Sequence, residues 1–218
     1  MEDSTALLGS NGNGKSTMAK LLAGRLKPMA GEMRASRKLK VGYFAQHQTD
    51  ELDLDATPLL QMERAAPNLT AEKCRAHIAR FGLDVQRAQT PIGNLSGGEK
   101  ARLLLGLATF HAPNMIILDE PTNHLDIDSR AALAEAINEF PGAVIMVSHD
   151  RYLIEACADR LWVVAEGRVR EYDGDLDDYR RDVLSSRGLA REREDVDVPQ
   201  AGRRGAGLGQ GALVDHGA

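Results

Sequence analysis

Short apolar runs recur along this chain between segments in which apolar residues are spaced three or four apart. The runs cover residues 6–8, 41–45, 115–118 and 143–147. Runs without polar alternation are typical of strands that are buried on both faces of a parallel sheet. The spacing of three or four places apolar residues on one face of a helix, as in residues 133–140. The pattern therefore predicts an α/β fold in which a mostly parallel central sheet is flanked by helices.

The segment over residues 50–90 contains no strand pattern. It predicts two helices, over 58–66 and 70–81, and Thr70 suits the N-cap of the second because its hydroxyl can accept a backbone hydrogen bond. We interpret residues from about 50 to 110 as a small helical insert within one domain.

The C-terminal part of the chain changes character near residue 188. Before that point the pattern predicts a helix, two strands and a last helix, over 152–160, 161–164, 169–172 and 176–184. We therefore expect a single domain over residues 1–187. The segment 188–218 is rich in Gly and Arg and has no sustained period, so we expect it to be disordered.

Composition narrows the class of protein. The 218 residues are 43% hydrophobic and 27% charged, with a formal net charge of −5, which argues against a protein that coats nucleic acid. Cys74 and Cys157 lie far apart without metal-type spacing, so we expect buried, reduced thiols. The first residues do not resemble a signal peptide, and no apolar run approaches the roughly 20 residues of a membrane-spanning helix. We expect a cytoplasmic protein without an intrinsic membrane segment.

A glycine-rich loop follows the first apolar run. Residues 9–17, GSNGNGKST, fit the phosphate-binding pattern G-x-x-x-x-G-K-[ST], and an apolar face from Met18 to Leu26 predicts a helix directly after it. Such a loop turns its N–H groups toward phosphate oxygens, while its lysine reaches the β- and γ-phosphates and its serine can bind Mg²⁺. The nucleotide-binding candidates are Gly9, Asn11, Gly12, Asn13, Gly14, Lys15, Ser16 and Thr17.

Two carboxylates and a histidine follow the buried strands. Asp119 and Glu120 end the run 115–118, and His149 follows the run 143–147. Open α/β sheets bind their ligands at the carboxyl ends of the strands. Asp119 could therefore hold Mg²⁺ and Glu120 could activate a water. Gln46 follows the run 41–45, and it is a functional candidate only if a nucleotide site lies beside it.

A second helix start carries two glycines. Ser96, Gly97, Gly98 and Glu99 match the S-x-x-E capping box, and an apolar helical stretch follows. The capping box explains the serine and the glutamate on structural grounds alone. The N–H groups at this helix start add a possible second anion site.

These motifs stand in the order found in ATP-binding cassettes. GSNGNGKST, Gln46, LSGGEKAR, IILDEPTNHLD and SHD resemble the Walker A loop, the Q-loop, the family signature, Walker B with its D-loop, and the switch histidine. The resemblance implies a P-loop ATPase that uses ATP and Mg²⁺. Ser16 and Gln46 would bind Mg²⁺, and Asp119 would reach it through water. Glu120 would polarise the attacking water, and His149 would contact the γ-phosphate, so Glu120, His149 and Gln46 are the catalytic candidates.

The resemblance also implies a partner. In the family, signature residues such as Ser96 to Glu99 close over the ATP of a second cassette, and the D-loop, here Asn123 to Asp126, contacts that cassette. The chain resembles ABC-F proteins in three features: the motif PTNHLD, the short insert and the later segment YDGDLDDY. ABC-F proteins carry two cassettes on one chain, and many of them act on the ribosome. We expect the second cassette of such a protein, with a homodimer or a missing half as partner and ribosome or tRNA as possible targets.

Two features depart from that pattern. Only eight residues precede Gly9, none of them aromatic, so the residue that stacks on adenine in the family has no counterpart. The second cassette and its linker are also absent, so we expect a fragment. Two alternatives stay open: the ATP-binding subunit of a membrane transporter, and a catalytically inactive binding module.

Overall fold

The computed structural model describes residues 4–45, 52–122 and 125–185. Gln46, Asn123 and the predicted disordered tail lie outside these ranges. The chain divides into two compact units, Met1–Leu176 and Asp177–Ala218, which are described separately.

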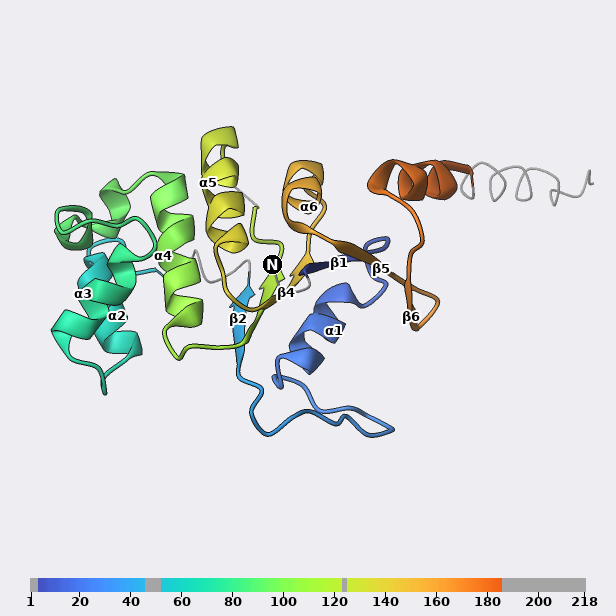
Figure 1. The fold of residues 1–218 in the computed structure, drawn as a ribbon, viewed down its shortest axis with the longest axis horizontal. Coiled ribbons are helices and arrows are strands. Elements are labelled where there is room, and N and C mark those ends of the chain that lie inside the picture. Colours follow the sequence, from blue (N-terminus) through green and yellow to red (C-terminus); the bar gives the residue numbers. More distant parts are fainter. Residues whose placement is uncertain (1–3, 46–51, 123–124, 186–218) are drawn as a thin grey trace, which may run out of the picture. The chain divides into compact units, whose positions relative to one another are not determined.

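A six-stranded sheet forms the centre of the first unit, with the strand order β2-β3-β4-β1-β5-β6 (Figure 1). The strands are β1 (Ser4–Leu8), β2 (Val41–Ala45), β3 (Met115–Asp119), β4 (Ala143–Val147), β5 (Arg160–Ala165) and β6 (Arg168–Glu171). Neighbouring strands are parallel except β5 and β6, which pair antiparallel. The mostly parallel sheet predicted from the apolar runs is confirmed.

Helices lie on both sides of this sheet. Figure 1 shows α1 (Lys15–Leu22) on one side and α5 (Ile127–Asn138) and α6 (Arg151–Cys157) on the other. Ala19 of α1 packs into a buried cluster with Leu7, Ile117 and Val147 of the sheet. In the described part of the chain, no helix is long and apolar enough to cross a bilayer.

The predicted helical insert contains α2 (Pro58–Ala65), α3 (Ala71–Ala79), two 3₁₀ turns (Arg87–Gln89 and Ile92–Asn94) and α4 (Gly97–Thr109). The Thr70 hydroxyl accepts a hydrogen bond from the Lys73 N–H at 3.4 Å, as expected for an N-cap. Helix α2 packs on α3, and α4 packs along α5. Cys74 of α3 and Cys157 of α6 are buried free thiols, as predicted.

Several helices end earlier than their apolar patterns predicted. Helices α2 and α3 end at Ala65 and Ala79, against predicted ends at 66 and 81. Helix α1 ends at Leu22, and the backbone then turns through Gly24 at φ 70°, so that Leu26 lies outside the helix and is 42% exposed. The helix predicted over 152–160 ends at Cys157, because Arg160 already pairs with β1 as the first residue of β5. In the second unit, the last described helix continues to residue 185, against a prediction of 176–184.

Strand register brings the polar ends of the strands together. Asp119 pairs with Ala45 of β2 on one side and with Val147 of β4 on the other, while Leu7 of β1 also pairs with Val147. These residues therefore form one row at the carboxyl edge of the parallel strands. The loop after β1, Glu120 after β3 and residues 148–150 after β4 all leave the sheet at this edge.

Candidate functional site

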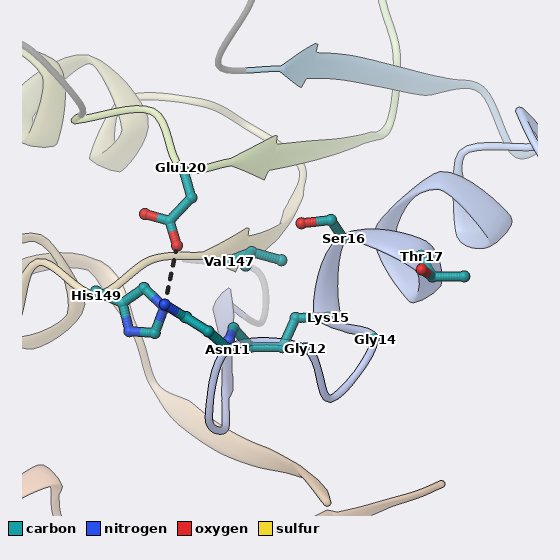
Figure 2. Close-up of a pocket in the computed structure, with 9 residues that line it drawn as sticks. All are labelled: Asn11, Gly12, Gly14, Lys15, Ser16, Thr17, Glu120, Val147 and His149. Carbon is teal, nitrogen blue, oxygen red and sulfur yellow. Dashed lines mark ion pairs between the residues drawn. The ribbon is translucent and has the colours of Figure 1, made fainter.

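A pocket of about 490 Å³ lies at the carboxyl edge of the sheet (Figure 2). Its lining residues come from the glycine loop, the start of α1 and the ends of β3 and β4: Asn11, Gly12, Gly14, Lys15, Ser16, Thr17, Glu120, Val147 and His149. Segments more than 100 residues apart in the sequence thus meet around one cavity. All but one of these residues, Val147, are site candidates from the sequence.

The glycine loop packs closely against the backbone of β5. Gly9 has φ 143°, and a β-carbon at that position would lie 2.3 Å from the Val164 carbonyl oxygen. Asn13 donates its side-chain N–H to the same oxygen at 3.1 Å. Neither Gly9 nor Asn13 lines the pocket, so their contribution is to fix the path of the loop.

Lys15 is the cation of the site and is only 7% exposed. Its Nζ donates to the carbonyl oxygens of Gly9 at 2.7 Å and Ser10 at 3.2 Å. Burial lowers the pKa of this ammonium, while the charges of Glu120 and Asp119 act to raise it. The loop therefore carries a positive charge at its centre, beside the N-terminal end of α1, and this is an arrangement suited to phosphate oxygens.

A buried carboxylate connects α1 to the sheet. Ser16 Oγ donates to Asp119 Oδ1 at 2.9 Å, and Tyr43 Oη donates to Asp119 Oδ2 at 3.1 Å. Burial, followed by the Asp119 charge, raises the pKa of Tyr43 to about 12, so its phenol keeps its proton at neutral pH. Tyr43 was not among the candidates from the sequence, because its role depends on β2 being the neighbour of β3.

The oxygen atoms of Ser16 and Asp119 fit a hard divalent cation. Mg²⁺ in nucleotide sites takes one or two carboxylates and completes its shell with phosphate oxygens and water. In the described ranges, no group of three or more His, Cys, Asp or Glu side chains forms a metal cage. A cation held here would therefore need oxygens from a bound phosphate.

Glu120 and His149 lie side by side in the lining of the pocket, as the dashed line in Figure 2 shows. Nε2 of His149 lies 3.5 Å from Oε1 of Glu120. Glu120 has φ 52°, a left-handed conformation that is rare outside glycine, and its N–H donates to the Val147 carbonyl at 2.8 Å. Burial raises the pKa of Glu120, while His149 and Lys15 act to lower it. A carboxylate with a raised pKa is a stronger base toward water than an ordinary one.

None of the residues Ser96–Glu99 is among those that line this pocket. Its capping box is confirmed, since Glu99 Oε2 accepts from the Ser96 N–H at 2.8 Å and Ser96 Oγ accepts from the Glu99 N–H at 3.2 Å. A β-carbon at Gly97 would lie 2.8 Å from Ser129 Oγ of α5, and Gly98 is also close to Ser129. The two glycines therefore allow α4 to approach α5 closely, a packing role that the sequence did not indicate.

Asp126 is the N-cap of α5 and does not line the pocket. Its carboxylate accepts from the Ser129 N–H at 2.8 Å, and hydrogen bonds from Ser129 lower its pKa. One turn on, Arg130 donates from Nε to the Leu125 carbonyl at 3.1 Å and pairs through NH1 with Asp150 at 3.1 Å. Arg130 thus joins the segment before α5 to the residue that follows His149, a link absent from the sequence-based candidates.

Comparison with protein families gives a match to the model described as "ABC transporter" over residues 2–123. The "Probable ATP-binding protein YheS" of Escherichia coli K12 is 47% identical over 175 residues, covering 80% of this chain and 28% of that protein. "ABC transporter F family member 3" of Arabidopsis thaliana is 41% identical over 186 residues, covering 85% of this chain and 26% of that protein. The chain therefore spans about a quarter of the length of these relatives.

Solved structures have the same fold. A dimeric ATP-binding cassette in a post-hydrolysis state, bound to ADP and Pi, has a TM-score of 0.62 at 21% identity, covering 80% of this chain and 87% of that one. An archaeal ribosome recycling factor, aABCE1, in complex with the ribosomal stalk protein aP1 has a TM-score of 0.60 at 26% identity, covering 84% of this chain and 37% of that one. The mostly parallel sheet with helices on both sides is therefore the fold of an ATP-binding cassette.

Proposed function

This chain belongs to the ABC transporter family of ATP-binding cassettes, and from that premise we propose that it hydrolyses ATP with Mg²⁺ in the pocket between Lys15 and Glu120. The proposal rests above all on one observation: Lys15, Ser16, Glu120 and His149 line one pocket, in which Ser16 donates to Asp119 at 2.9 Å and Glu120 lies 3.5 Å from His149. This places candidate metal ligands beside a candidate base.

The pocket residues have two kinds of role in phosphoryl transfer: some bind the phosphates and the metal, and others act on the attacking water and the γ-phosphate. Lys15 and the N–H groups of the glycine loop bind the phosphates, and Ser16 and Asp119 hold Mg²⁺, with Gln46 as a further predicted ligand. When bound, Mg²⁺ adds positive charge at the phosphate oxygens. Glu120 orients a water and accepts its proton, while His149 donates a hydrogen bond toward the γ-phosphate. Such catalysis consists mainly of positioning and charge stabilisation.

The Glu120→Gln variant tests this assignment. It should lose Mg²⁺-dependent release of phosphate from ATP by a factor of about 10² or more, because the base is removed, while still binding a fluorescent ATP analogue. Glu166→Gln is a matched control, since Glu166 also has φ 52° but sits in the exposed turn between β5 and β6. Equal hydrolysis by Glu120→Gln and the parent chain would overturn the role of Glu120.

A second cassette completes the proposed site. The Ser96–Glu99 segment does not line the pocket of its own chain, which is consistent with a role at the nucleotide of a partner. That partner is either a second copy or another part of a longer protein. Dimer formation by Glu120→Gln on addition of ATP, measured by sedimentation, would support this arrangement, and dimerisation that Ser96→Arg leaves unchanged would count against it.

We also propose a translation-associated role of the ABC-F type. The F-family relatives support it, as does the likeness to a ribosome recycling factor. Co-sedimentation of the Glu120→Gln variant with ribosomes in the presence of ATP is the expected result. Co-purification with an integral membrane protein would instead favour the transporter alternative, and a failure to bind ATP would favour an inactive module.

A further inference from the structure

We propose that Tyr43 is a positioning residue for the metal site, which orients the Asp119 carboxylate so that Oδ1 stays directed at Ser16. The inference deepens the proposed function and rests on it, because the metal in question is the Mg²⁺ that accompanies ATP. It adds to the site a residue of β2 that does not line the pocket.

The two oxygens of Asp119 have separate partners. Oδ1 accepts from Ser16 Oγ at 2.9 Å, and Oδ2 accepts from Tyr43 Oη at 3.1 Å. Asp119 and Tyr43 are each only 7% exposed, so solvent cannot easily replace the phenol as a donor. A carboxylate fixed at one oxygen cannot rotate freely, and its other oxygen is therefore presented in a constant direction.

The phenol is itself fixed from two sides. Its ring lies in the buried cluster that includes Ala19 of α1 and Ile117 of β3. On another side the Arg25 guanidinium lies 4.6 Å from the ring centroid, in a cation–π contact. Arg25 is attached to the end of α1, since its N–H donates to the Lys20 carbonyl at 2.8 Å.

Helix α1 therefore reaches Asp119 by two routes. Ser16, in its first turn, contacts Oδ1 directly, and Arg25, just beyond its last turn, contacts the tyrosine that donates to Oδ2. Partners behind a metal ligand fix its orientation, and their removal typically lowers metal affinity by about 10–100-fold. Tyr43 has the geometry of such a partner.

The Tyr43→Phe variant isolates the hydroxyl, because the ring, the cluster and the cation–π contact all remain. The test measures binding of a fluorescent ATP analogue in the non-hydrolysing Glu120→Gln background while Mg²⁺ is titrated from zero. We expect the Mg²⁺ concentration at half-maximal effect to rise by about 10-fold or more. Binding in EDTA should change by less than about twofold. Tyr152→Phe, on an exposed α6 residue, is the matched control and should change neither value.

A second readout uses Mn²⁺ in place of Mg²⁺, with electron paramagnetic resonance to count the metal bound with ATP. A rise in the Mn²⁺ dissociation constant with unchanged ATP binding in EDTA supports the proposal. An unchanged metal dependence overturns it, and so does an equal loss of binding with and without metal, which would indicate a general structural role. A parent chain that binds no ATP at all would overturn the proposed function, and this inference with it.

Discussion

The contact between the glycine loop and β5 leads to a quantitative prediction for Gly9→Ala. Alanine at φ 143° costs about 1–3 kcal/mol in backbone strain. Its β-carbon would also lie 2.3 Å from the Val164 carbonyl oxygen, so the loop must move and the Asn13 hydrogen bond to that oxygen is lost. A lost hydrogen bond adds about 0.5–1.5 kcal/mol, which brings the expected destabilisation to about 2–4 kcal/mol.

Urea unfolding of matched variants measures this value. Gly12→Ala is the control, because Gly12 also has positive φ, 86°, but has nothing within 4 Å of its β-carbon position. We expect it to lose about 1–2 kcal/mol from strain alone. Asn13→Ala should cost less in the Gly9→Ala background than in the parent, since the same bond is already broken. Equal losses for Gly9→Ala and Gly12→Ala, or fully additive losses for Gly9→Ala and Asn13→Ala, would refute the reasoning.

Three further predictions follow from buried ionisable groups. Because the folded state raises the pKa of Glu120, ionisation of this side chain destabilises the folded chain. The cost is absent below the ordinary glutamate pKa, and it is imposed as the pH rises through the pKa that Glu120 has in the folded state. Glu120→Gln should therefore resist urea better than the parent at about pH 8, and an equal advantage at about pH 4 would contradict this. Arg130→Ala leaves the Asp150 carboxylate, 8% exposed, without its cation and should cost about 1–3 kcal/mol in urea unfolding. Arg34→Ala, in a pair with 85% and 70% exposed side chains, should change little. Burial raises the pKa of Cys157 to about 11, so iodoacetamide at about pH 8 should modify it only after unfolding, as judged by mass spectrometry, and rapid labelling of the native chain would refute this.

The parts of the site that sequence could predict are those with local causes. The glycine loop and the helix after it occupy consecutive residues, and the Ser96–Glu99 capping box spans a single turn. Asp119 and Glu120 were identified because a buried run ends in them. In each case the residues that define the geometry are close in the chain, so spacing alone carries the information.

The parts that sequence missed depend on which elements are neighbours in space. Tyr43 and Asp119 are 76 positions apart, and their hydrogen bond exists because β2 pairs with β3. The Arg130–Asp150 pair likewise depends on α5 and α6 lying side by side. The apolar pattern also predicted that α1 extends to Leu26. The helix is shorter, because the spacing of apolar residues does not reveal the backbone turn at Gly24.

The register at the carboxyl edge has a consequence for insertions and deletions. Ala45, Asp119 and Val147 lie in one row because β2, β3 and β4 are each five residues long and pair end to end. One residue gained or lost inside β3 would turn Asp119 to the opposite face of the sheet, away from both Ser16 and Tyr43. A change of length in the segment between α1 and β2 would leave the row intact. Related chains can therefore differ in length at their loops while the length of these three strands stays fixed.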